Sequence, residues 1–153
     1  MNYWLMKSEP DVFSLADLRK APAMTAHWDG VRNYQARNYI RDRMRHGDLA
    51  YFYHSSCRPP GIAGIIEIVS APYADHTAFD SKNPHFDPAG TADNPRWYMV
   101  DVRFRQAFDT LITLDTLRQH PPLLPLPLLQ RGNRLSVMPV LPEQWKLIET
   151  LAR

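Results

Sequence analysis

The chain has 153 residues, of which 44% are hydrophobic and 22% are charged. This length suits a single domain and this composition supports a buried core, so disorder of the whole chain is excluded and we expect one domain over residues 1–153. The formal net charge of +2 is too small to indicate by itself a protein that binds nucleic acid.

The first ten residues, MNYWLMKSEP, hold an apolar stretch that is too short for a secretory signal or a membrane span. The single cysteine, Cys57, cannot form a disulfide within the chain and belongs to no zinc-binding motif. We therefore expect an intracellular protein, in the cytoplasm or on the nucleoid, that contacts no membrane. The sequence leaves the oligomeric state open.

The first third of the chain predicts one strand and two helices. Residues 2–7 are apolar and aromatic, which predicts a strand that ends at a turn. Ser14 and Asp17 form the pattern of a capping box and predict a short helix through residue 18. Asn33 is a good N-cap for a longer helix that Gly47 would end, with apolar residues on one face and arginines at every fourth position on another.

Strands dominate the middle of the chain. Residues 49–54 and 62–69 predict two strands, and the second is apolar enough to be central in a sheet. Residues 71–96 contain four prolines and little periodicity, which predicts a long loop of the kind that often has a function. Residues 97–104 alternate between apolar and polar side chains and predict a strand with one exposed face.

The last third predicts a helix over 113–119, a brief turn that ends at Gly132, a strand over 134–140 and a closing helix that starts at Pro142. That helix would bury Trp145, Ile148 and Leu151. Short strands mixed with short helices indicate an α+β domain.

Charge is unevenly distributed along the chain. Between Arg32 and Arg45 there are five arginines and one aspartate, whereas four aspartates and one lysine lie between Asp75 and Asp93. An asymmetry of this kind suits a polyanion that binds one face of the protein. The alternative is that the arginines only solvate a helix face.

The sequence offers little support for an enzyme. His54 and Cys57 are close enough to suggest a thiol and its base, but no helix N-terminus is predicted behind the cysteine. The long loop carries five side chains of types that bind metals: Asp75, His76, Asp80, His85 and Asp87. Their spacing matches no metal-ligand motif. We therefore expect these polar side chains to be solvated and to bind no metal. Signatures of phosphate loops, nucleophile elbows and zinc deaminases are absent.

Residues 28–33 form the pattern that points most clearly to a ligand. They bring an indole, a carboxylate, a glycine, a guanidinium and an amide together just before the basic helix. A nucleobase needs a flat face to stack on, hydrogen-bonding partners and a cation for its phosphate. The alternative interpretation is that Trp28 belongs to the core and Asn33 only caps the helix.

Six segments carry a resemblance to a known family: MKSEPD at 6–11, WDGVRNYQARN at 28–38, GDLAYFYHS at 47–55, GIAGIIEIV at 61–69, WYMVDVRF at 97–104 and RLSVMPV at 134–140. In this order, and over nearly the whole chain, they resemble the EVE domain. One departure is Leu141 with Pro142, where the family usually continues with polar residues.

The resemblance implies a PUA-like fold, in which a mixed β-barrel with peripheral helices surrounds a pocket for a modified base in DNA or RNA. Modified cytosine and N6-methyladenine are the candidate bases. Transferred motif by motif, the pocket would be lined by Lys7, Ser8, Glu9, Trp28, Asn33, Tyr53, His54, Ser55, Ser136 and Met138, with Trp97 at the loop mouth as a further wall.

Within that set we expect an exposed Trp28 to be the stacking platform. Asn33 or Ser55 would contact the base edge and Glu9 would accept an exocyclic amine, while Tyr53 and Met138 are equally well explained as barrel core. Phosphates would be bound by Arg32, Arg37 and Arg41.

No cofactor is implied. The alternative functions are an RNA-binding accessory domain of translation or RNA modification, and a nucleoside-acting enzyme that uses Glu9 or His54 as its acid or base.

Overall fold

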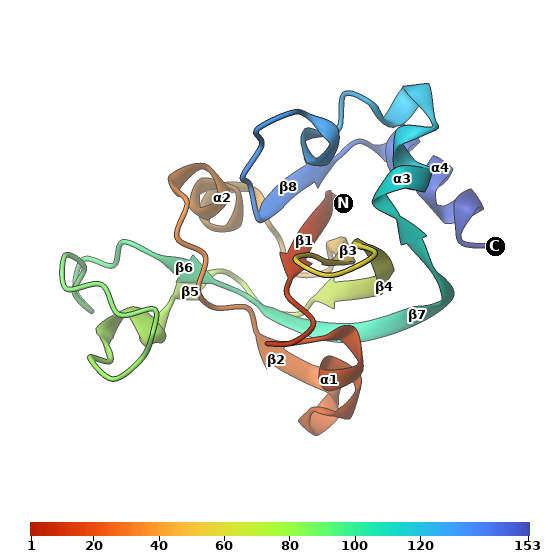
Figure 1. Ribbon diagram of the computed structural model, residues 1–153. Helices are drawn as coiled ribbons and strands as arrows, with labels where there is room; N and C mark the ends of the chain where they lie inside the picture. The colour runs from red at the N-terminus through yellow and green to blue at the C-terminus, as the bar shows by residue number, and fades with distance from the viewer.

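The computed structural model describes all residues from 1 to 153 (Figure 1). Six strands form one curved mixed sheet in the order β2-β7-β4-β3-β1-β8. Their bounds are β1 Tyr3–Ser8, β2 Thr25–His27, β3 Leu49–His54, β4 Gly61–Ile68, β7 Asp101–Thr113 and β8 Val137–Val140. β1 and β3 run parallel, and all other neighbours are antiparallel. The sheet is a half-barrel with β2 and β8 at its edges, and it confirms the predicted α+β, PUA-like class.

The apolar strand β4 lies between β3 and β7, as its sequence predicts. A central strand is covered on both faces, which explains why it reads as a nearly continuous apolar run. The core around it is one cluster of 31 buried residues. It includes Trp145 and Ile148 of the closing helix α4 (Pro142–Leu151), as expected, whereas Leu151 at the helix end is only partly buried.

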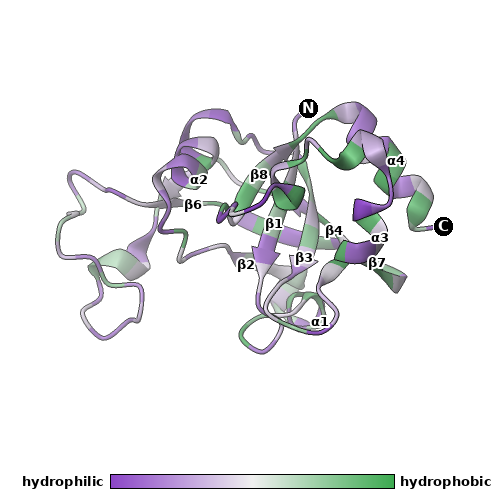
Figure 2. Ribbon diagram, turned by 45° about the horizontal axis from the view of Figure 1, so that its top comes forward, coloured by the Kyte–Doolittle hydropathy of each residue, from purple (hydrophilic) through white to green (hydrophobic).

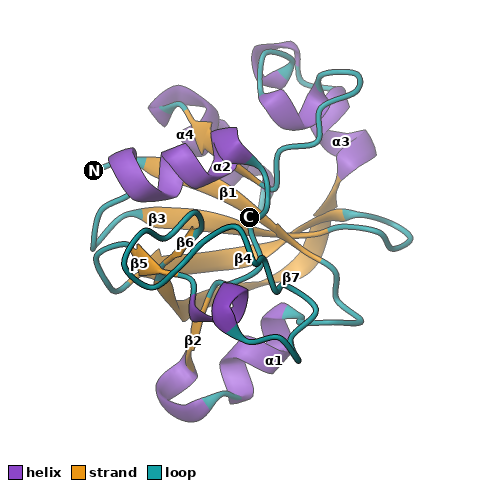
Figure 3. Ribbon diagram, turned by 90° about the vertical axis from the view of Figure 1, so that its left-hand side faces the viewer, coloured by secondary structure: helices purple, strands orange, loops and turns teal.

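Helices surround the rim of the sheet, with α1 at one end and α2 and α4 near the other (Figure 3). The regular helices are α1 Leu15–Lys20, α2 Tyr34–Asn38, α3 Leu114–Arg118 and α4 Pro142–Leu151. Ser14 and Asp17 form the predicted capping box, and Pro142 opens α4 as expected. No helix is both long and apolar enough to cross a bilayer.

The single long helix predicted to run from Asn33 to Gly47 is wrong. Asn33 caps α2, but that helix passes into a π-helical turn, η2 Tyr39–Arg43, and the backbone is extended at Met44. The apolar positions Ala36, Ile40 and Met44 are still fully buried. The apolar pattern therefore predicted which side chains are buried but not how far the helix extends.

The strand predicted over 97–104 is divided in two. Tyr98–Met99 form β6, which pairs with β5 Tyr73–Ala74 in a separate two-stranded sheet, and the chain then enters β7. The predicted loop over 71–96 therefore begins with a short strand and continues in a 3-10 turn, η3 His76–Phe79. This segment projects from the sheet and is mainly hydrophilic (Figures 1 and 2).

Three further differences concern the strands and the segment before β8. β7 extends to Thr113, because its second half has an exposed face whose polar residues hide the strand pattern. The three-residue edge strand β2 and the preceding turn η1 Pro22–Met24 were not predicted. Before β8, which starts only at Val137, the chain forms two 3-10 turns, η4 Pro121–Leu123 and η5 Pro127–Leu129.

Candidate nucleic-acid interface

A cavity of about 550 Å³ opens between the ends of β1 and β2 and the projecting segment. Its size falls in the range of small-ligand pockets, which is roughly 300–1,000 Å³. The residues that line it are Lys7, Ser8, Val12, Phe13, Ala26, His27, Trp28, Asp29, Asn83, Pro84 and His85. Lys7, Ser8 and Trp28 are the members of this set that the sequence predicted for the base pocket.

A buried ion pair holds the outer wall of the cavity. Asp75 is completely buried, and its carboxylate accepts hydrogen bonds from the Gly30 N–H at 2.8 Å and from the Arg32 guanidinium at 3.0 Å. Arg32 also donates twice to the main-chain oxygen of His85, at 2.6 and 3.2 Å. These contacts tie the wall residue His85 to the segment that follows β2. The expected solvation of Asp75 is therefore wrong.

The charge of Asp75 is maintained by its hydrogen bonds. Burial raises the pKa of a carboxyl group, but the hydroxyl and amide of Thr77, the amide of Gly30 and the guanidinium of Arg32 outweigh that effect and lower the pKa of Asp75. The carboxylate is therefore ionised at neutral pH and balances the charge of Arg32.

Gly30 allows the wall to approach the main chain closely. Its φ is +78°, and a Cβ built on it would lie 2.7 Å from the imidazole ring of His85. Both features favour glycine, because a side chain at this φ is strained and would also collide with the ring. The width of the cavity at this wall thus depends on a residue that has no side chain.

Trp28 is buried, with only 7% of its surface exposed, so the expected exposed indole is wrong and the alternative, that Trp28 belongs to the core, is confirmed. Its ring packs edge-to-face against Phe52, at 5.4 Å between centroids. The Trp28 indole N–H donates to no protein group, unlike the N–H groups of Trp4 and Trp97. Since the protein contains no fully buried side-chain nitrogen or oxygen without a partner, this N–H keeps some solvent exposure, and Trp28 is one of the residues that line the cavity.

Lys7 and Asp29 give the cavity groups of opposite charge. Lys7 is half-buried and forms no ion pair, and burial lowers the pKa of its ammonium group. Asp29 lies 3.6 Å from the His27 imidazole and keeps a third of its side chain exposed. The cavity therefore offers a cationic donor that has no ion-pair partner and a carboxylate acceptor that is partly exposed.

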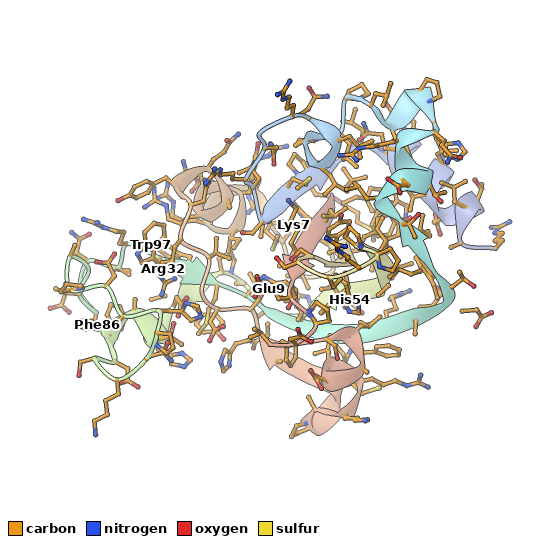
Figure 4. All side chains as sticks on the ribbon, in the orientation of Figure 1. Lys7, Glu9, Arg32, His54, Phe86 and Trp97 are labelled. Carbon is orange, nitrogen blue, oxygen red and sulfur yellow. The ribbon has the colours of Figure 1, made fainter.

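Three predicted pocket residues flank the end of β1 without lining the cavity. Glu9 is exposed in the turn after β1. The Ser55 N–H donates to the Ser8 oxygen at 3.0 Å, and the Ser136 oxygen accepts from the Lys7 N–H at 2.8 Å. These main-chain bonds position β1, while the role of the side chains remains a prediction. Figure 4 shows Lys7, Glu9 and His54 around this strand end.

Four other predicted pocket residues have contacts within the fold. The Asn33 side chain caps α2 by accepting from the Ala36 N–H at 3.0 Å, as the alternative interpretation has it. Tyr53 and Met138 belong to the core. His54 Nε2 accepts from the Leu15 N–H at 3.2 Å, and burial lowers the pKa of this imidazole. None of these four lines the cavity, and ligand contact by them remains a prediction.

Trp97 lies apart from the cavity lining. Its indole N–H donates to Asp87 at 2.6 Å, and its ring stacks on Tyr34 at 5.0 Å between centroids. The guanidinium of Arg32 lies 5.4 Å from the centre of the Trp97 ring. Figure 4 shows Trp97 and Arg32 together, at a distance from Lys7.

The three arginines predicted to bind phosphate differ in their partners. All five guanidinium hydrogens of Arg32 are engaged within the protein, which gives it a structural role instead. Arg41 forms a bidentate ion pair with Asp42, with hydrogen bonds of 2.8 and 3.0 Å. Arg37 bonds only neutral oxygens, those of Asn38 and Arg96, and has no carboxylate partner. Its charge is the one left unneutralised.

The residues considered for catalysis or metal binding are not assembled into a site. The Cys57 thiol contacts the main-chain oxygens of His54 and Pro59, both at 3.6 Å, and no hydrogen bond joins it to the His54 imidazole. No three histidine, cysteine or acidic side chains come together as a metal site would require.

Several lining residues were not predicted from the sequence. Ala26 and His27 lie on the edge strand β2, which is too short to give a pattern. Asn83, Pro84 and His85 lie in the projecting segment, whose contact with residues 28–32 depends on the fold. In the sequence, only the length of this segment indicated that it has a function.

The half-barrel with its cavity defines a PUA-like fold, and the chain belongs to the EVE domain family, whose model matches residues 2–151. It is similar to thymocyte nuclear protein 1 of Mus musculus, with 45% identity over 98% of this chain and 73% of the relative.

Solved structures show the same likeness. A protein from Pseudomonas putida superposes with a TM-score of 0.95 and 51% identity, over 99% of both chains. Human THYN1 in complex with DNA that contains 5-methylcytosine superposes with a TM-score of 0.91 and 42% identity, over 100% of this chain and 98% of that chain.

Proposed function

We propose that this protein binds nucleic acid that carries a modified base, and that it holds this base, turned out of its strand, in the cavity beside Trp28. The proposal is carried by the likeness over the full chain to human THYN1, whose structure contains DNA with 5-methylcytosine. Modified cytosine in DNA is therefore the first candidate, with N6-methyladenine and modified RNA as the alternatives to be tested.

The polar groups of the cavity suit the edge of cytosine. The Watson–Crick edge of cytosine presents one amine donor and two acceptors, the ring nitrogen and the carbonyl oxygen. Asp29 supplies an acceptor, while the Lys7 ammonium and the Trp28 indole N–H supply two donors that have no partner in the protein. Asp29 thus replaces Glu9 as our candidate for the exocyclic amine, because Glu9 does not line the cavity.

Apolar side chains of the cavity suit a methyl group and a ring face. Val12, Phe13 and Ala26 line it together with Trp28. Stacking on an aromatic ring contributes roughly 1–3 kcal/mol per base, whereas turning a base out of a duplex costs a few kcal/mol. Contacts to the strand must therefore supply the remaining affinity, and Arg37 is our candidate phosphate ligand.

We further propose that the protein binds the base without transforming it, and that it acts inside the cell where its partner is found. A reader of this kind needs the cavity to select the mark and the surrounding surface to hold the strand.

The test is a binding titration at low salt with fluorescent oligonucleotides that are identical except for one central base. The set contains cytosine, 5-methylcytosine, adenine and N6-methyladenine, each in DNA and in RNA. We expect at least several-fold tighter binding of the strand with 5-methylcytosine than of the strand with cytosine, and Lys7→Met should weaken binding of both strands, because it removes the unpaired cation that faces the edge shared by the two bases.

Lys146→Met is the matched control, since Lys146 is exposed on α4, a helix that lies away from β2 and the projecting segment (Figure 1). It should bind like the unaltered protein. Equal affinity for all strands, unchanged by Lys7→Met, would refute the proposal.

A further inference from the structure

A large aromatic side chain lies exposed next to the cavity wall. Tyr34, the first residue of α2, has 52% of its surface exposed, although its ring is well supported. It stacks on the Trp97 ring at 5.0 Å with an interplanar angle of 25°. Trp97 is in turn fixed by Asp87 and covered by Arg32. The ring is therefore held in place while much of it faces solvent.

Arg37 adds an unneutralised charge to this ring. Its guanidinium carbon lies 4.8 Å from the centre of the Tyr34 ring, and Arg37 follows Tyr34 by three residues on α2. Three of its five guanidinium hydrogens are bound by the oxygens of Asn38 and Arg96, so two remain available. No carboxylate pairs with it, in contrast to Arg32 and Arg41.

The surface formed by Tyr34 and Arg37 is joined to the cavity through Arg32. This residue contacts the Trp97 ring that supports Tyr34, and it also bonds the main-chain oxygen of the wall residue His85. Asp29 on the cavity wall and Tyr34 are five residues apart, so their Cα atoms are separated by at most about 18 Å. A short stretch of one strand can therefore contact both places.

We propose that Tyr34 and Arg37 form a second nucleotide subsite, which takes an unpaired nucleotide a short distance along the strand from the base in the cavity. Trp97 covers one face of the Tyr34 ring and the Arg37 guanidinium lies over the ring, so the base stacks on the exposed part of this ring and guanidinium pair, as bases do on both kinds of group, and the free hydrogens of Arg37 suit a phosphate. Paired bases of a duplex keep their faces covered, so the ligand of this surface is a single strand. The proposal rests on the proposed function, because it assumes that the neighbouring cavity holds a base.

The experiment compares a ligand that fills only the cavity with one that reaches both sites. Binding of 5-methyldeoxycytidine monophosphate and of a single-stranded pentanucleotide with a central 5-methylcytosine is measured by calorimetry or fluorescence. We expect Tyr34→Ala to weaken binding of the pentanucleotide about 5- to 10-fold, as loss of one stacking contact predicts. Binding of the mononucleotide should be unchanged.

Tyr34→Phe keeps the ring and is the matched control, expected to bind the pentanucleotide within about 2-fold of the unaltered protein. An unchanged affinity of Tyr34→Ala for the pentanucleotide would overturn the proposal, and so would an equal loss for both ligands, since the residue would then act on the cavity. A duplex that binds as tightly as the single strand and depends equally on Tyr34 would overturn the choice of an unpaired partner.

Failure of the proposed function gives a different result. In that case the methylated and unmethylated pentanucleotides bind equally, and the effect of Tyr34→Ala on the unmethylated strand still decides whether this surface binds nucleic acid.

Discussion

Two groups of aromatic residues on either side of the sheet use their polar atoms in different ways. Under α4, Tyr51 stacks on Trp145 at 3.8 Å, and its hydroxyl donates to the Trp145 main-chain oxygen at 2.8 Å. Tyr3 stacks on the same indole at 4.5 Å. At the cavity, Trp28 also packs edge-to-face in the core, but its N–H has no protein partner and the nearby Lys7 has no counter-ion.

The difference separates residues that stabilise the fold from residues that are available to a ligand. Buried polar groups without partners cost stability, so natural proteins pair them. Under α4 the buried Tyr51 hydroxyl follows that rule, although the Trp145 indole N–H, like that of Trp28, donates to no protein group. The cavity leaves one donor and one cation free, which is tolerated because solvent reaches them and which prepares them for a ligand.

Truncation under α4 should have the largest effect on stability. We expect Trp145→Ala to lower the free energy of unfolding by about 3–5 kcal/mol, since it removes a buried indole and two stacked contacts. Urea unfolding monitored by circular dichroism measures this loss. Modified-base preference should persist in whatever fraction remains folded; loss of that preference in folded protein would show that the two regions are coupled.

The wall of the cavity should depend on the buried ion pair. Asp75→Asn should lower the free energy of unfolding by about 2–3 kcal/mol, because Arg32 loses a charged partner in the interior. The lowered pKa of Asp75 also predicts how stability depends on pH. This contribution is fully present above the ordinary pKa of an aspartate, about 3.9, and is lost as the pH falls through the lowered folded value.

Urea unfolding between pH 2 and 7 tests both points. The difference between Asp75→Asn and the unaltered protein should shrink as the pH falls through the acid range. A constant difference at all pH values would contradict a structural role for the Asp75 charge.

A smaller effect is expected at Gly30. Gly30→Ala places a Cβ 2.7 Å from the His85 ring at a φ of +78°, so stability should fall by about 1–2 kcal/mol and His85 must move. Binding of the modified strand should weaken as well, because the wall shifts. Gly132→Ala is the matched control: its φ is +77°, but no atom lies within 4 Å of the added Cβ. If the two variants bind equally well, the position of His85 does not control the cavity.

The smallest effects are expected for two tryptophans whose indole N–H groups differ in whether they have a partner in the protein. Trp28→Phe should weaken binding of the modified strand by about 1 kcal/mol while lowering stability only through the lost ring volume, because its N–H has no protein partner. Trp4→Phe should leave binding unchanged and cost more stability, since it also removes the hydrogen bond that the Trp4 N–H donates to the buried Asp48 at 3.0 Å. Parallel titrations and unfolding curves for the two variants measure both quantities. Equal losses of stability would mean that the Trp28 N–H is already satisfied in the free protein.

Features that depend on neighbouring residues were determined by the sequence itself. Ser14 and Asp17 specify a helix start, Asn33 a cap and Pro142 the first residue of α4, because each acts on backbone groups within three positions of itself. The apolar run of β4 indicated a central strand, because successive side chains of a strand face opposite sides of the sheet and a central strand is covered on both. The ordered motifs also identified the family, and with it the half-barrel class.

Tertiary structure alone decided which polar groups are occupied. Arg32 was predicted to bind phosphate, but it meets Asp75 and His85, which are 43 and 53 positions away in the chain. Trp28 was expected to be exposed, but packing in the core leaves only 7% of its surface exposed, although it lines the cavity. Lining residues come from four separate segments, two of which give no periodic signal. Local patterns report on near neighbours, whereas burial and ion pairing are set by segments that meet only after folding.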